Sequence, residues 1–108
     1  MLPWPFSDDL SKQKPRPALV ISSDTFNISN EDAIFLFITT AEYSSPFDLR
    51  LKSNDPRLSS TGLKSASTFR TSKLLTLSKN MAKARLGHAD MALLSDIELR
   101  LKSVLDIA

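Results

Sequence analysis

The 108-residue chain has no cysteine, a single histidine and only two glycines. The lack of cysteine excludes disulfides, thiolate zinc sites and cysteine nucleophiles, and it is compatible with a reducing cytoplasm. One histidine, His88, cannot form a catalytic or metal-binding histidine pair within one chain, and we expect it in a surface turn. No glycine-rich phosphate loop, spaced set of metal ligands or Gly-x-Ser-x-Gly motif is present. We therefore expect no cofactor and no metal, and we interpret Asp8 and Asp9 as a solvated loop.

Long apolar runs are also missing. The longest, from Ala33 to Ile38, is far too short to span a membrane. No signal peptide is indicated, because the apolar start at Trp4 leads straight into Asp8 and Asp9. We therefore expect a soluble, cytoplasmic protein with no membrane partner, forming one domain over residues 1–108 with a single modest core.

The net charge of +2 conceals an uneven distribution of charge. Acidic residues concentrate in residues 24–55 and in the C-terminal segment. Residues 64–85 contain basic side chains and no acidic one: Lys64, Arg70, Lys73, Lys79, Lys83 and Arg85. A segregated positive face favours a polyanion or an acidic protein as partner. A merely solvated face explains the same charges, and charge alone slightly favours that reading.

Several short segments have the composition of β-strands, whereas the polar residues 24–32 are expected to form a loop. Residues 33–40 form a continuous β-branched and aromatic run, which predicts a central strand buried on both faces. Residues 47–52 alternate, which predicts a half-exposed strand with Phe47, Leu49 and Leu51 inward and Asp48, Arg50 and Lys52 outward. The other candidate strands are Ala18–Ile21, Ser67–Arg70, Lys73–Leu77 and, more weakly, Ala84–Leu86.

The last segment has a helical period. Its apolar side chains recur at steps of three and four, at Met91, Leu94, Ile97, Leu101 and Leu105. A run of short strands closed by one amphipathic helix predicts a mainly β fold, namely a small, strongly bent antiparallel barrel capped by a C-terminal helix.

Arg16 is the first candidate for chemistry. It follows a basic loop with Lys12 and Lys14, and it lies between Pro15 and Pro17, which restrict the backbone on both sides. A guanidinium held in this way is suited to binding a phosphate through two hydrogen bonds. The alternative is a surface arginine at a strand entrance without a function.

Hydroxyl groups end the predicted central strand. Thr39 and Thr40 lie where side chains leave the core, so they either cap a turn or donate a hydrogen bond to a phosphate beside Arg16. Arg70, on a later strand, is a third polar group that a closed barrel would bring to the same opening.

These motifs resemble the MazF/PemK (Kid-like) toxins of type II toxin–antitoxin systems. The resemblance covers nearly the whole chain, through PFSDDLSKQKPRPALVIS, AIFLFITT, FRTSKLLTL, ARLGH and the terminal helix. It implies an SH3-like barrel, a homodimer and a metal-independent endoribonuclease that cleaves single-stranded RNA at short sequences, leaving a 2′,3′-cyclic phosphate and a 5′-hydroxyl. It also implies an acidic antitoxin partner and, together with that antitoxin, operator DNA.

The resemblance also assigns residues. Arg16 and Thr39 match the catalytic arginine and threonine of the family, and Arg70 matches an arginine used in the Kid-like branch for catalysis or RNA contact. Ser72 stands where relatives usually carry Asp or Glu, and the Gly-Asp-Ile/Val start of the first strand is missing, so we expect a truncated first strand. RNA contacts are expected from Lys12, Lys14, Thr40, Ser72 and Lys73.

The implied chemistry agrees with the residues present. The 2′-hydroxyl of the RNA is the nucleophile, so the protein needs only positioned cations and donors around a phosphate. Arginine is a poor general base at its normal pKa, which leaves the group that moves the proton open. Two alternatives remain: a CcdB-like toxin that binds DNA gyrase through its C-terminal helix, and a degenerate barrel that binds antitoxin and operator DNA without cleaving anything.

Overall fold

The computed structural model describes residues 2–3, 15–82 and 85–107. These residues form six strands, two α-helices and two short 3-10 helices, the latter at Pro56–Thr61 and Lys79–Met81. The strands and α-helices are β1 (Leu2–Pro3), β2 (Pro15–Arg16), β3 (Ala18–Val20), α1 (Asp24–Ser29), β4 (Asp32–Thr39), β5 (Leu49–Leu51), β6 (Ser67–Ser78) and α2 (Met91–Leu105).

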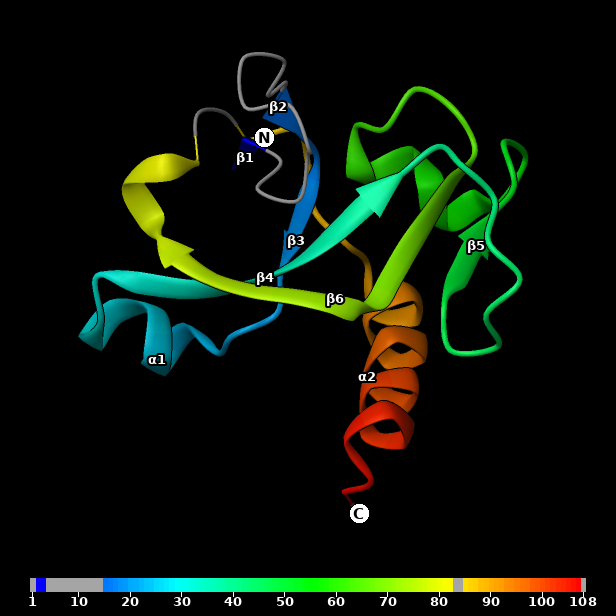
Figure 1. Cartoon of the computed structure of the whole chain (residues 1–108). Helices are drawn as coiled ribbons and strands as arrows, with labels where there is room; N and C mark the ends of the chain where they lie inside the picture. The colour runs from blue at the N-terminus through cyan, green and yellow to red at the C-terminus, as the bar shows by residue number, and fades with distance from the viewer. Residues whose placement is uncertain (1, 4–14, 83–84, 108) are drawn as a thin grey trace.

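Four strands form one antiparallel sheet in the order β3-β4-β6-β5, and β1 pairs with β2 in a second, two-stranded sheet. The larger sheet is strongly curled into a half-barrel, with α2 packed at one side (Figure 1). The mainly β barrel-like architecture with a C-terminal helix is therefore confirmed. The strands expected at residues 18–21 and 33–40 are present as β3 and β4.

One long strand, β6, replaces the two short strands expected between residues 67 and 77, so that expectation is wrong. Its register to β4 shifts between the pairs Leu36–Leu74 and Phe37–Arg70, where the strand bends without breaking. The buried hydroxyl of Thr71 fixes this bend by donating a hydrogen bond of 2.6 Å to the carbonyl of Phe47. In the sequence, the polar residues of this bulge look like a turn between two strands. The sequence therefore predicted two short strands where the structure has one.

Two apolar clusters lie on the two faces of the sheet. The larger contains Leu36, Ile38 and Phe69 and packs beneath α2, whereas the smaller is built around Phe35 and Phe37. Strand β4 contributes to both, which confirms the prediction that it is buried on both faces. The curled sheet thus has an apolar cluster on each of its two faces.

The terminal helix was predicted correctly, but it buries a different face. Leu93 and Ile97 are its buried residues, while Met91 is 83% exposed and Leu94 and Leu105 are largely exposed. The observed stripe shares Ile97 with the expected one, so periodicity alone did not distinguish the two. The helix begins at Asp90, whose carboxylate accepts a hydrogen bond of 2.8 Å from the Leu93 amide. Within the described residues, no helix is long and apolar enough to cross a membrane.

Two segments differ from their predicted structure. Residues 24–29 form α1 instead of a loop, because the Ser23 hydroxyl caps the helix by accepting from the Phe26 amide. The weaker strand candidate at residues 84–86 is not observed from Arg85 onward, and residue 84 lies outside the described residues. The chain there passes tightly against residues 60–62: a Cβ at Gly87 would lie 2.4 Å from the Ser60 carbonyl. Close contact of this kind requires glycine and leaves no room for a ladder.

Ion pairs join the C-terminal helix to the segment that follows β5, and hydrogen bonds join it to the loop before β5. Arg57 bonds to Asp55 at 2.9 Å and to Asp96 at 3.0 Å, and Asp96 also accepts from Arg100 at 2.8 Å. Arg100 in turn donates to the backbone carbonyls of Pro46, at 3.2 Å, and of Asp48, at 2.7 Å. The position of the loop before β5 therefore depends on α2.

We expect the stability of the protein to fall with acidification through this network. The hydrogen bond from Arg57 lowers the pKa of Asp55. Burial raises the pKa of Asp96, but the bonds from Arg100 and Arg57 outweigh it and leave that pKa lowered. Carboxyls with depressed pKa values stabilise the fold above the unfolded value of about 4, and this contribution is lost as pH falls below it.

Urea unfolding between pH 7 and pH 3 tests this expectation. Asp96→Asn should cost about 1 kcal/mol at pH 7 and flatten the loss of stability below pH 4. Glu98→Gln, an exposed position two residues further along α2, is the control and should change neither quantity appreciably. An unchanged pH profile in Asp96→Asn would contradict the assignment.

Candidate active site

The sheet register brings four polar side chains into one row. Thr39 on β4 pairs with Thr68 on β6, and Thr68 pairs with Arg50 on β5. Ala18 pairs with Phe37, and the Ile38 amide donates to the Pro17 carbonyl at 3.2 Å. Continued by one residue, this register sets Arg16 level with Thr39. Cross-strand partners share a face of a sheet, so the row on this face, here called the polar row, consists of Arg16, Thr39, Thr68 and Arg50.

Beside the polar row, an arginine is paired with a buried carboxylate. Arg70 lies two residues beyond Thr68 on the same face, and its Nε is 2.7 Å from Oδ2 of Asp48. The Asp48 side chain is 1% exposed and that of Arg70 is 14% exposed. Within the described part of the chain, neither Asp48 carboxylate oxygen receives a well-aligned hydrogen bond. The contact is therefore an ion pair that depends on charge and burial.

An aromatic ring covers this pair. The guanidinium carbon of Arg70 lies 3.6 Å from the centroid of the Tyr43 ring, a cation–π contact, and Tyr43 remains 50% exposed. Asp48 and Tyr43 together fix the orientation of Arg70 and leave little of it open to solvent. Arg70 thus presents less surface to a phosphate than the sequence led us to expect.

The hydroxyl of Thr39 has a structural partner. Its Oγ1 accepts a hydrogen bond of 3.2 Å from the Ala41 amide, so Thr39 does cap the turn after β4. A hydroxyl that accepts in this way still has a proton to donate. The turn is fixed from below, because Arg50 donates to the Thr40 carbonyl at 2.7 Å and Thr68 donates to the Ala41 carbonyl at 2.8 Å.

The expected RNA-contacting residues are distributed over three places. Thr40 directly follows the end of β4 and is exposed, whereas Ser72 and Lys73 are exposed in the bend of β6, beyond Arg70. Lys12 and Lys14 lie outside the described residues, as do Asp8 and Asp9. Arg16 is exposed. The sheet register therefore places Arg16, Thr39 and Arg70 on one face.

Sequence analysis missed Asp48, Arg50, Thr68 and Tyr43. The alternation of residues 47–52 correctly separated Asp48 and Arg50 from Leu49, but their face was interpreted as open to solvent. That interpretation is wrong for Asp48, which is only 7% exposed as a residue because Arg70 and the loop before β5 cover it. The signal that could have found the pair is an aspartate and an arginine on adjacent strands, both pointing away from the leucine face.

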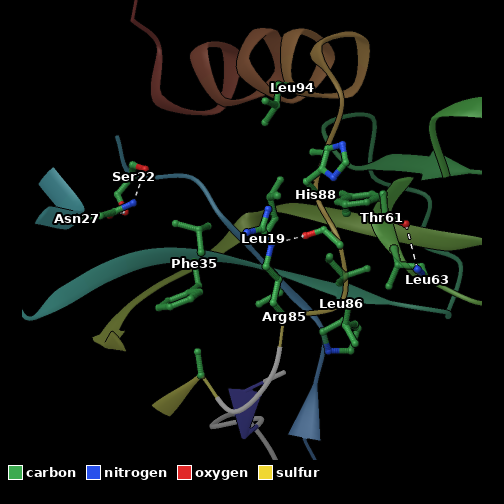
Figure 2. Close-up of a pocket in the computed structure, with 18 of the residues that line it drawn as sticks. Leu19, Ser22, Asn27, Phe35, Thr61, Leu63, Arg85, Leu86, His88 and Leu94 are labelled. Carbon is green, nitrogen blue, oxygen red and sulfur yellow. Dashed lines mark hydrogen bonds between the residues drawn. The ribbon is translucent and has the colours of Figure 1, made fainter. Parts of the chain in front are cut away.

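A larger hollow of about 750 Å³ lies beside β3, and it is separate from the polar row. Figure 2 shows His88 and Arg85 at this hollow together with Leu19 and Phe35. The His88 amide donates to the Ser60 carbonyl at 2.9 Å, and the residue is exposed at the surface but is not part of a turn. Across the described residues, no group of three or more His, Asp or Glu side chains could hold a metal ion.

A curled antiparallel sheet with a helix at its end defines a small barrel protein, and one face of this sheet carries two arginines that flank two threonines across its strands. The family described as PemK-like, MazF-like toxin of type II toxin–antitoxin system matches residues 4–105, so the chain belongs to this family. No curated protein sequence matches the chain significantly.

Solved structures of the same fold come from bacterial toxins. A mycobacterial endoribonuclease in complex with its cognate antitoxin superimposes with a TM-score of 0.74 at 20% identity, over 93% of this chain and 88% of that one. The Mycobacterium tuberculosis toxin MazF-mt6 gives 0.74 at 14% identity, over 92% of each chain. MazF from Deinococcus radiodurans gives 0.72 at 19% identity, over 98% of this chain and 90% of that one. At these identities, the superpositions establish the fold.

Proposed function

We propose that this protein is a metal-independent endoribonuclease toxin that cleaves single-stranded RNA at short sequences. The observation that carries the proposal is the polar row, in which Arg16 and Thr39 lie level on adjacent strands of one face. A phosphodiester placed between them meets a cation on one side and a hydroxyl donor on the other. Membership of the toxin family and the antitoxin-bound mycobacterial endoribonuclease of the same fold support this function.

In the proposed reaction, the 2′-oxygen of the RNA attacks the adjacent phosphorus. The bond from phosphorus to the 5′-oxygen breaks, which leaves a 2′,3′-cyclic phosphate on one product and a 5′-hydroxyl on the other. Arg16 offsets the charge of the phosphorane, and the Thr39 hydroxyl orients a non-bridging oxygen. Neither side chain is a base at neutral pH, so water carries the proton away from the 2′-hydroxyl and supplies one to the 5′-oxygen.

Arg70 has a secondary part in this proposal. Its guanidinium is enclosed by Asp48 and Tyr43, so it steadies the site and adds charge beneath it more than it contacts the phosphate. Ser72 is exposed in the bend of β6 and has no carboxylate, so it takes no proton in this scheme.

Cleavage should continue at full rate in excess EDTA, because the RNA supplies the nucleophile and the protein supplies the charge. Purified protein is incubated with a mixed single-stranded RNA, and the product ends are identified by their resistance or susceptibility to phosphatase and kinase. Activity that is lost in chelator and restored by magnesium would reject this mechanism. Inhibition of gyrase without any RNA cleavage would favour the CcdB-like alternative, and binding of antitoxin alone would favour the degenerate barrel.

We further propose a cytoplasmic homodimer that binds RNA across two joined faces, is neutralised by an acidic antitoxin and, with that antitoxin, binds operator DNA. MazE–MazF complexes from Deinococcus radiodurans share this fold, and large apolar side chains are exposed on α2 at Leu94 and Leu99. Sedimentation should give a dimer, and RNA affinity should fall steeply with salt as counterions are released. A monomer with salt-independent affinity would contradict this assembly.

A further inference from the structure

A hollow of about 690 Å³ lies beside Tyr43, at the end of the polar row that is furthest from Arg16. Its size is typical of a small-molecule pocket. Its lining combines an aromatic ring, a carboxylate, two cations and a side-chain amide, from Tyr43, Glu42, Arg50, Lys52 and Asn54. The aromatic ring can stack on the base of a nucleotide, the carboxylate and the amide can form hydrogen bonds to the edge of that base, and the two cations can bind its phosphate.

The walls of this hollow are fixed before any ligand arrives. Nη1 of Arg50 donates to the carbonyls of Thr40 and Ala41 and, at 2.9 Å, to the Thr68 hydroxyl. The Tyr43 ring rests on the Arg70 guanidinium, which is itself paired with a buried carboxylate. Since the ring is half exposed, a base can stack on it without displacing this support.

The hollow is continuous with the face that carries the proposed reaction. From Arg16 to Arg50, the polar row crosses three strand spacings, about 14 Å in all. One nucleotide bound at Arg16 and Thr39 therefore leaves the hollow to another nucleotide of the same strand, lying across β4, β6 and β5. Proteins that bind single strands commonly combine such a basic track with an aromatic stacking platform.

We propose that the hollow is a subsite for a nucleotide that flanks the cleaved bond, with its base stacked on Tyr43 and its phosphate near Lys52. This inference rests on the proposed function, because the polar row holds the rest of the strand. Glu42 is 83% exposed at its side chain and only 3.7 Å from Arg50, so its carboxylate can turn towards a base edge. Carboxylates accept from exocyclic amines, as on cytosine, and amides such as Asn54 pair with adenine. The subsite should prefer a base with an exocyclic amine over uracil.

The first test compares two RNAs, the shortest one that the full-length protein cleaves and a longer one that reaches the hollow. Tyr43→Ala should lower kcat/KM about tenfold on the long RNA, chiefly through KM, and leave the short RNA unchanged. Tyr43→Phe keeps the stacking face and should match the parent. Ile28→Ala, exposed on α1, is the control. An equal loss on both RNAs would mean that Tyr43 only supports Arg70, and it would overturn the subsite.

A binding measurement separates this inference from the proposed function. The probe is the long RNA with a 2′-deoxy residue at the cleaved position, which cannot react by the proposed route. Weaker binding by Tyr43→Ala supports the subsite even if the parent cleaves no RNA. Equal binding by the two proteins overturns the subsite and leaves the nuclease intact, whereas no binding by the parent overturns both.

The base preference has its own measurement. Sequencing of the cleaved ends of a random RNA pool gives the preference at each position near the cut. Glu42→Gln should lose the preference for exocyclic amines at one flanking position without a change at the cleaved bond. An unchanged preference would reject the role of Glu42 in the subsite.

Discussion

Arg16→Ala should lower the rate of RNA cleavage at least 100-fold, which is the effect of removing one transition-state donor from an active site. The side chain is exposed and lies at the start of the sheet, so its loss removes no packing. Circular dichroism and thermal unfolding of the mutant should therefore match those of the parent. The measurement is single-turnover cleavage of a labelled single-stranded RNA.

Arg85→Ala provides the matched control for that experiment. Arg85 is an exposed arginine too, but it lines the hollow beside β3 and not the polar row. Removing it deletes the same charge and should weaken cleavage only slightly, through the general attraction of the protein for RNA. Equal rates for parent and Arg16→Ala would remove Arg16 from the active site, and equal losses in the two variants would reduce its role to general attraction.

Asp48→Ala should be the most destabilising single change at this face, at about 3 kcal/mol of unfolding free energy. Removing one partner of a buried pair leaves the other charge uncompensated, and Arg70 is only 14% exposed. Chemical denaturation measures the loss. RNA cleavage by the variant should also fall, because Arg70 and the Tyr43 ring above it lose their support.

Two further variants test the origin of this effect. The double variant Asp48→Leu/Arg70→Leu removes both charges and should recover much of the lost stability while remaining poorly active. Glu98→Ala deletes an exposed acid that pairs with Lys102 at 3.3 Å and should cost less than 0.5 kcal/mol. If Asp48→Ala is as mild as Glu98→Ala, the buried pair contributes little to stability.

The sequence predicted those elements of the fold whose apolar residues follow a clear pattern. The apolar run of β4 is buried on both faces, and the helical period at the C-terminus predicted α2. Arg16 and Thr39 were proposed as site residues from the local chemistry of strand ends and from the family resemblance, and the sheet register sets them level with each other. Each of these features depends only on a short stretch of chain, so it can be predicted from one sequence.

The alignment of the site residues, the burial of Asp48 and the buried face of α2 could not be predicted, because they depend on strand register and on tertiary contacts. No local pattern aligns Arg50 with Thr68 and Thr39, because that alignment is set by how β6 pairs with β4 on one side and β5 on the other. Asp48 looked like an ordinary outward residue of an alternating strand, and its burial arises only when Arg70 arrives from another strand. The one-residue error in the buried face of α2 has the same cause, since the sheet selects the stripe that fits it.

The central place of β6 has a consequence for when the polar row can form during synthesis of the chain. Strands β4 and β5 leave the ribosome before β6, yet β6 lies between them in the finished sheet. A nascent chain that ends before residue 67 already carries Arg16, Thr39 and Arg50, but nothing joins them into one surface. Insertion of a late central strand makes assembly a non-local and comparatively slow step. Under the function proposed above, the chain therefore cannot cleave RNA until β6 has left the ribosome and has joined β4 to β5.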